Sequence, residues 1–213
     1  MTLEPLAVAI VNHKGGVGKT TIAHVMAQIA VQRGMKVAAY DLDLQRNLTD
    51  SLSLVELSGL NIRTRINEGD ENDSNDIYIL DCPPALSSVT DKAIAFADLV
   101  LVPVFPNLYS VTNLDMLYTR VKNTGKIREQ IAIVKNCFDE TALSRDLDAF
   151  LAEKGYSIAG RLPQNKRLRA NISTGLVWNY SMSARNQTPF AHLFDRTLRA
   201  FKELDKGNPG KAW

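Results

Sequence analysis

The stretch His13-Lys14-Gly15-Gly16-Val17-Gly18-Lys19-Thr20 decides the fold, because it has the composition and the flanks of a phosphate-binding loop. A continuous apolar run at residues 6–11 precedes it, and residues 21–32 follow it with the spacing of a helix. Its glycines allow consecutive backbone N–H groups to surround phosphate oxygens, and the helix N-terminus adds partial positive charge at the same place. An ordinary glycine-rich turn would not require the Gly-Lys-Thr ending.

Two lysines and a threonine carry the expected chemistry of this loop. Lys19 is predicted to reach the β and γ phosphates of a bound nucleotide, and the Thr20 hydroxyl is predicted to ligate Mg²⁺. His13 occupies the place of the first glycine in the usual Gly-x-x-x-x-Gly-Lys-Ser/Thr pattern, and a second lysine, Lys14, precedes the glycines. The other residues of the predicted nucleotide-binding segment are Gly15, Gly16, Val17, Gly18 and Thr21.

The composition indicates a globular domain of ordinary type. The chain has 213 residues, of which 45% are hydrophobic and 23% charged, enough for one α/β domain with a sizeable core. The N-terminal residues lack the pattern of a signal peptide, and no apolar run approaches the roughly 20 residues of a membrane span. Two cysteines, Cys82 and Cys137, cannot form a disulfide framework. We therefore expect a cytoplasmic protein with reduced thiols.

The charges are distributed unevenly along the chain. Residues 161–213 hold ten Lys and Arg against three Asp and Glu, whereas residues 1–160 hold 15 against 20. A basic terminal quarter on an acidic body predicts a surface that faces a polyanion, with a solvated basic helix face as the alternative. The residues expected to contact DNA are Lys166, Arg167, Arg169, Arg196 and Arg199.

The rest of the chain alternates apolar strands with helical patterns, which predicts a parallel sheet covered on both faces. Strands are expected at residues 6–11, 36–40, 61–66, 77–80, 99–104, 130–135 and 156–159. Helices are expected at residues 21–32, 47–57, 87–96, 109–123, 143–153, 166–172 and 189–204. Right-handed crossovers then give a single α/β domain over residues 1–213, a three-layer α/β/α P-loop fold with a mostly parallel twisted sheet.

Polar residues follow three of these strands. Asp41 and Asp43 come after the second strand, Asp81 after the strand at residues 77–80, and Asn136 after the strand at residues 130–135. In open α/β sheets the ligand crevice lies beyond the carboxyl ends of the strands, so these side chains should gather beside the phosphate loop. Asp81 has the position of a Walker B carboxylate, which holds Mg²⁺ directly or through water.

Three further segments lack the pattern of a regular element. Residues 67–76 contain five acidic residues and no basic residue, which predicts a solvated loop, with a metal site as a weaker alternative. Residues 162–165 are expected to form a turn. Residues 206–213 are expected to be a flexible tail.

Four stretches of the sequence resemble the ParA/MinD family of ATPases, whose phosphate loop deviates from the usual pattern. They are the Lys-Gly-Gly-Val-Gly-Lys-Thr loop at 14–20, Asp-Leu-Asp-Leu-Gln at 41–45, Asp-Cys-Pro-Pro at 81–84 and Leu-Pro-Gln-Asn-Lys-Arg-Leu at 162–168. Leu44 replaces a proline of the family pattern, and Gln164 replaces an arginine. The resemblance covers about residues 6–204 and is strongest to small ParA-type DNA partition ATPases.

The resemblance implies specific roles for several residues. Lys14 would cross a dimer interface and contact the phosphates that the partner holds. Asp43 would orient or activate the attacking water, and Asp41 would support the Mg²⁺ shell. Asn136 and Pro163 would frame the adenine of ATP. The missing proline at Leu44 bears on the geometry of the Asp43 loop.

The resemblance also implies a function. The chain begins almost directly with its first strand, so we expect no N-terminal helix-turn-helix domain. In the similar small class, an ATP-bound homodimer binds DNA without sequence preference and sits on the nucleoid. A ParB-like centromere-binding or adaptor protein stimulates ATP hydrolysis, and the cycle positions a plasmid, chromosome or other cargo.

Two alternatives remain open at this point. A MinD-like ATPase would bind membrane through a C-terminal amphipathic helix, for which the helix at 189–204 is the candidate. A metabolic enzyme on the same fold, such as a nitrogenase-iron-protein-like reductase or an amide ligase, would need cluster cysteines or a second substrate pocket.

Overall fold

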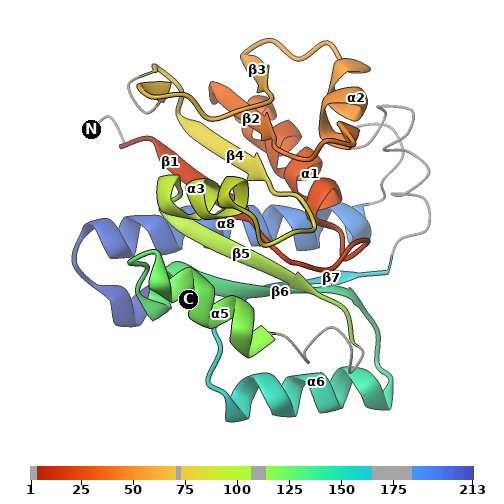
Figure 1. Cartoon of the computed structure of the whole chain (residues 1–213). Helices are drawn as coiled ribbons and strands as arrows, with labels where there is room; N and C mark the ends of the chain where they lie inside the picture. Colours follow the sequence, from red (N-terminus) through yellow and green to blue (C-terminus); the bar gives the residue numbers. More distant parts are fainter. Residues whose placement is uncertain (1–3, 71–72, 107–113, 165–183) are drawn as a thin grey trace.

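Within the described residues, a seven-stranded sheet with every pairing parallel forms the centre of the molecule. The computed structural model describes residues 4–70, 73–106, 114–164 and 184–213 (Figure 1). The strands are β1 (Leu6–Ile10), β2 (Val37–Asp41), β3 (Leu60–Arg63), β4 (Ile77–Asp81), β5 (Leu99–Val104), β6 (Ile131–Phe138) and β7 (Ile158–Pro163). Their order across the sheet is β3-β2-β4-β1-β5-β6-β7. The strand that leads into the phosphate loop is therefore central.

Helices cover both faces of this sheet (Figure 1). One face carries α1 (Lys19–Gln32), α2 (Asn47–Ser53) and α8 (Ala184–Asp205). The other face carries α3 (Ser88–Phe96), α5 (Leu114–Asn123) and α6 (Ala142–Glu153). Two short 3-10 helices, η2 (Arg128–Gln130) and η3 (Pro209–Lys211), lie before β6 and after α8. The predicted three-layer parallel α/β fold is confirmed.

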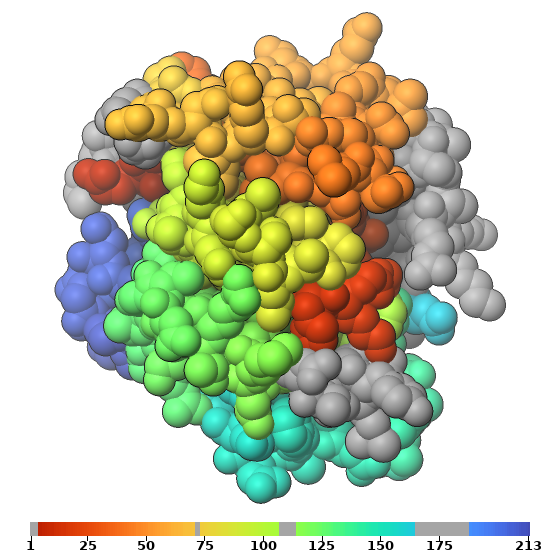
Figure 2. All heavy atoms as spheres, viewed as in Figure 1, coloured from red at the N-terminus to blue at the C-terminus, as the bar shows by residue number. Residues whose placement is uncertain are grey.

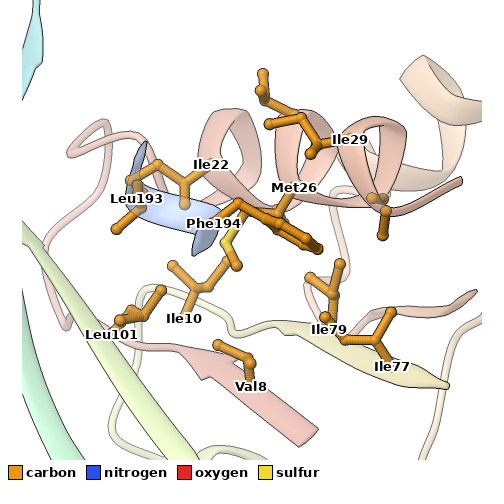
Figure 3. Close-up of a cluster of buried hydrophobic side chains, with 14 of the residues drawn as sticks. Val8, Ile10, Ile22, Met26, Ile29, Ile77, Ile79, Leu101, Leu193 and Phe194 are labelled. Carbon is orange, nitrogen blue, oxygen red and sulfur yellow. The ribbon is translucent and has the colours of Figure 1, made fainter. Parts of the chain in front are cut away.

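Alternate residues of each central strand feed two separate cores, because successive side chains of a strand point to opposite faces. In β1, Val8 and Ile10 pack with the helices α1 and α8, whereas Ala9 packs on the side of α3, α5 and α6. Met26 of α1 and Phe194 of α8 lie above the sheet in the first cluster (Figure 3). The continuous apolar runs in the sequence reflect this burial on both faces.

Several expected boundaries differ from the structure. Helix α2 ends at Ser53, α8 begins five residues before the expected Pro189, and β7 continues through Pro163, where a turn was expected. Pro163 pairs with Phe138 after a register irregularity on the edge strand, where a residue without an N–H costs little. The helix expected at 109–123 is described from Leu114, and the one expected at 166–172 lies outside the described residues.

We expected the acidic segment at 67–76 to be a solvated loop. In the structure, one of its carboxylates is buried and held by polar contacts. Asp70 is only 8% exposed; it accepts a hydrogen bond from the Tyr40 hydroxyl at 2.8 Å and pairs with Arg63 at 2.8 Å. Arg63 also pairs with Asp73. The charge that the segment lacks is supplied by an arginine of the edge strand β3, and a tyrosine of β2 completes the cluster.

The C-terminal residues are likewise ordered, whereas the sequence predicted a flexible tail. The chain forms η3 after α8, and Ala212 is fully buried. The indole Nε1 of Trp213 donates a hydrogen bond to the Glu129 carbonyl at 2.6 Å. The polar composition of this segment does not reveal the burial of Ala212 or the hydrogen bond of Trp213, because both depend on residues far away in the sequence.

Candidate nucleotide-binding site

The phosphate loop connects the central strand β1 to helix α1 at the carboxyl edge of the sheet. Gly15 and Gly16 are exposed, while Val17 is fully buried and anchors the loop to the core. Gly18 precedes α1 with φ 95°, a backbone conformation that favours glycine. In the space-filling view, red atoms of this N-terminal segment reach the surface beside yellow-green atoms of the chain that follows β4 (Figure 2). The loop is therefore accessible from solvent at Gly15 and Gly16.

A network of short contacts shapes the loop around its two lysines. The Nζ of Lys19 donates to the Lys14 carbonyl at 3.1 Å, and burial lowers the Lys19 pKa below its ordinary value. The nearby carboxylate of Asp81 acts in the opposite direction. Asn12 accepts from the Lys14 N–H at 2.9 Å and donates to the Pro103 carbonyl at 2.7 Å. Asn12, which the sequence analysis missed, thus fixes the backbone of Lys14 against β5.

The carboxylate of Asp81 has the features of a cation ligand. It is 1% exposed, and apart from the nearby Thr20 hydroxyl its oxygens have no hydrogen-bond partner among the described residues. Its pKa is raised to about 7, chiefly by burial and also by Asp41 and Asp43, while a hydrogen bond from Thr20 and the charge of Lys19 act in the opposite direction. A buried charge without a partner is costly, and Mg²⁺ prefers oxygen ligands. Asp81 and the Thr20 hydroxyl together therefore fit the predicted Mg²⁺ site.

Asp41 holds the loop that carries Asp43. It is fully buried, and its carboxylate accepts hydrogen bonds from the Thr49 N–H at 2.8 Å and the Asp43 N–H at 3.3 Å. It thereby stabilises the N-terminal turn of α2, where an acidic group is favourable. Asp43 itself is partly exposed, and its carboxylate accepts from the Gln45 N–H at 3.1 Å. The geometry gives Asp41 a positioning role; its support of the Mg²⁺ shell stays a prediction.

These elements surround an open cavity of about 280 Å³ at the carboxyl edge of the sheet. The expected residues that line it are Gly15, Gly16, Gly18, Lys19, Thr20, Thr21, Asp43, Asn136 and Pro163. Four further lining residues were missed, namely Asn47, Pro84, Phe105 and Cys137. Pro84 and Phe105 each follow a strand, so the rule that ligands bind beyond the carboxyl ends of strands could have found both. Lys14 lies outside this lining.

Residues 8–177 match the family described as the CobQ/CobB/MinD/ParA nucleotide binding domain. The chain belongs to this family. Soj, a chromosome-partitioning ATPase of Thermus thermophilus, is 30% identical over 142 residues, which are 49% of this chain and 56% of Soj. The chain therefore spans about half the length of this MinD/ParA-family relative.

Solved MinD/ParA-family structures share the fold. A plasmid partition protein of Borrelia burgdorferi bound to AMPPNP superimposes with a TM-score of 0.75 at 18% identity, over 90% of this chain and 97% of that one. The MinD cell division protein of Aquifex aeolicus superimposes with a TM-score of 0.76 at 18% identity, over 91% of this chain and 96% of that one. At this identity the likeness shows the fold alone.

Asn136 has both of its polar groups engaged inside the chain. Its Nδ2 donates to the Val17 carbonyl at 2.9 Å, and its Oδ1 accepts from the Cys137 N–H at 2.9 Å. A Cβ at Gly18 would collide with this Nδ2, so a side chain at position 18 would displace the Asn136 amide. Cys137 has φ 53°, a strained conformation that surrounding contacts must hold. In this geometry Asn136 braces the phosphate loop.

This bracing leads to a prediction that separates it from adenine recognition. Asn136→Ala is expected to weaken binding of ATP, GTP and tripolyphosphate alike, by about fivefold, because one hydrogen bond of about 1 kcal/mol no longer holds the loop. Calorimetric titration of the three ligands measures it, with the exposed Asn123→Ala as matched control. A selective loss of ATP affinity, with GTP and tripolyphosphate unchanged, would instead establish an adenine contact.

The residues expected to bind DNA are only partly described. Lys166, Arg167 and Arg169 lie outside the described residues. Arg199 is exposed on α8, whereas Arg196 is half-buried, and its Nη2 donates to a main-chain oxygen of Trp213 at 3.1 Å. The two arginines of α8 therefore differ, and Arg199 is the better candidate for a contact with DNA.

Proposed function

We propose that this chain is an ATP-dependent molecular switch that dimerises around ATP, binds DNA without sequence preference and takes part in positioning or partition of a cargo. The observation that carries the ATPase assignment is the buried Asp81 carboxylate beside Lys19 and Thr20 at the deviant phosphate loop. The family match supports a nucleotide-binding domain. The partition proteins among its relatives support the role in positioning.

The chemistry proposed for this site is attack of water on the γ-phosphate. Negative charge gathers on the phosphate oxygens, and the ammonium group of Lys19 together with the loop N–H groups stabilises it. Thr20 and Asp81 would hold Mg²⁺, which when bound would neutralise part of this charge. Asp43, which is partly exposed and lines the cavity, would orient the water. Asp41 keeps that loop in position through its hydrogen bond to the Asp43 N–H.

Dimerisation is the proposed regulatory step. A hydrogen bond to Asn12 fixes the backbone of Lys14. Lys14 does not line the nucleotide cavity of its own chain. Such a lysine can complete the nucleotide site of a second copy. A site that is incomplete within one chain gives slow basal turnover, which suits a switch, and a ParB-like or other adaptor protein would stimulate hydrolysis.

The proposal that the ATP dimer binds DNA rests on the segment 161–213, in which basic residues outnumber acidic ones. Doubling the patch by dimerisation raises affinity by multivalency, so binding should require ATP. Neutralising several phosphates predicts affinity that falls steeply with salt and depends little on sequence.

Charge reversal tests this prediction. Arg167→Glu with Arg199→Glu is expected to weaken binding to unrelated duplexes alike, by about tenfold or more, since two phosphate contacts are lost. Fluorescence anisotropy with ATP and with ADP over a salt series measures it, and Lys122→Glu on α5 is the matched control. Strong binding to one duplex only, or equal binding with ADP, would contradict nonspecific, ATP-gated binding.

A MinD-like membrane-positioning ATPase is the second candidate, since MinD shares the fold. Among the described residues, no helix is both long and apolar enough to cross a membrane. The apolar face of α8 is occupied, because Phe190, Leu193 and Phe194 are all at most 2% exposed against the sheet. Exposing one such phenylalanine costs about 1.5–3 kcal/mol, so α8 is a poor membrane anchor. Co-sedimentation of the protein with anionic vesicles in the presence of ATP would favour the membrane-positioning function over the DNA-binding one.

A metabolic reductase on this fold is disfavoured by the position of its candidate ligand. Cys82 is fully buried behind Asp81, and burial raises its thiol pKa. A cluster ligand must be a thiolate that reaches the metal, and this side chain instead packs in the core beneath α3.

A further inference from the structure

A second cavity lies at the opposite edge of the sheet from the nucleotide site. It has a volume of about 790 Å³ and is formed where the amino ends of β6 and β7 meet α8 and η3. The residues that line it are Arg128, Glu129, Ala152, Tyr156, Ser157, Ile158, Gly160, Arg161, Arg196, Pro209, Gly210 and Trp213. No residue of this lining belongs to the nucleotide cavity. The two cavities are separate sites.

The C-terminal residues form a fixed wall of this cavity. The Trp213 indole donates to the Glu129 carbonyl at 2.6 Å, and a main-chain oxygen of Trp213 accepts from Arg196 at 3.1 Å. Trp213 is partly buried against the core that contains Phe194, and the neighbouring Ala212 is fully buried. An aromatic ring is thereby held at the cavity with part of its surface accessible.

The charges around the cavity are predominantly positive. Three arginine side chains line it, those of Arg128, Arg161 and Arg196, against one acidic side chain, that of Glu129. Arg161 has a distant partner, Asp148, at 3.7 Å, and Arg128 donates to the Lys154 carbonyl at 3.0 Å. The side chains of the lining keep a net positive charge, because one Arg–Asp contact at that distance neutralises only part of the charge.

Arg196 supplies an unmet hydrogen-bond donor at this place. Its Nε is buried and has no partner among the described residues. Burial lowers the pKa of this guanidinium, and the nearby Arg199 lowers it further. An unpaired buried N–H is unfavourable, and an anion bound by the Nε and Nη groups of this half-buried guanidinium would satisfy it.

We propose that this cavity binds a small phosphate-bearing molecule, with its phosphate on Arg196 and Arg128 and any ring or apolar part against Trp213 and Ile158. Arginine forks match phosphate oxygens in pairs, and an aromatic side chain provides a stacking surface for a flat ring. Such a site gives the protein a second ligand that does not share the phosphate loop.

Trp213 offers a direct reporter of this site. The chain has two tryptophans, Trp178 and Trp213, so Trp178→Phe leaves Trp213 as the sole emitter. The protein would also carry Lys19→Ala, which removes phosphate binding at the loop. Titration with pyrophosphate and, separately, with AMP is expected to change Trp213 emission saturably at millimolar or lower concentration. AMP binding more tightly than pyrophosphate identifies a nucleotide-like ligand, and equal affinities identify a free anion.

Variants of the arginines decide the outcome. Arg196→Gln and Arg128→Gln are each expected to weaken the response at least tenfold, while Arg199→Gln, with the same charge change one turn along α8, leaves it intact. Calorimetry on the protein with both tryptophans provides a second readout if Trp178→Phe does not fold. No saturable response to either probe, or a response that both arginine variants retain, would overturn the proposal. Neither result would bear on ATP binding at the phosphate loop.

Discussion

ATP affinity is expected to fall by about 100-fold or more in Lys19→Ala, because hydrogen bonds from a cation to two phosphates contribute about 1.5–3 kcal/mol each. Lys19 is 6% exposed and lies beside Asp81, so its ammonium group enters the cavity from a buried position that water cannot replace. Calorimetric titration with Mg·ATP measures the loss.

Lys14→Ala serves as the matched control for this experiment. It removes the same charge from the same loop, yet a monomer of this variant should bind ATP with nearly unchanged affinity. Circular dichroism would show that both variants are folded. Near wild-type ATP affinity in Lys19→Ala would contradict the phosphate-loop assignment itself.

Hydrolysis is expected to collapse in Lys14→Ala, on the order of 10³-fold, the effect of a cationic group supplied in trans to a phosphoryl-transfer site. The same variant should fail to dimerise with ATP, as measured by light scattering. Asp43→Ala should differ from it: it should bind ATP, turn over at least about 100-fold more slowly, because the positioned acceptor for water is gone, and accumulate as an ATP dimer.

Mixing two inactive variants makes the test of Lys14 sharper. In a mixed dimer of Lys14→Ala and Lys19→Ala, one nucleotide site contains Lys19 in its own chain and Lys14 from the partner. That site is complete, so the mixture should recover part of the activity that neither variant has alone. A Lys14→Ala protein that dimerises and hydrolyses ATP normally would remove the proposed dimer mechanism.

Local sequence patterns were reliable wherever a short segment contains its own reason to fold. The strand, glycine loop and helix around Lys19 were predicted from composition and spacing, and the structure places the loop as expected. The carboxylate of Asp81 was located in the same way, because acidic residues directly after a buried strand must emerge at the carboxyl edge of a parallel sheet. Errors in these regions were limited to element ends, such as the early end of α2 at Ser53.

Contacts between distant segments could not be predicted in this way. Asp70 looked solvated because its partners, Tyr40 and Arg63, lie on two different strands. The C-terminal residues looked flexible because Trp213 finds its acceptor 84 residues away, at Glu129. Composition describes the affinity of a segment for water, but the identity of its neighbours is set by the order of strands in the sheet.

The sequence by itself therefore determined the parallel α/β fold, the phosphate loop and the acidic residues around it, since backbone propensity and side-chain periodicity act over a few residues. Tertiary structure alone decided that Asn136 braces the loop through Val17, 119 residues away. It also decided which arginine of α8 faces solvent and which lines the second cavity. The physical reason is that hydrogen bonds and burial act between atoms that touch, and chain topology determines which distant atoms touch.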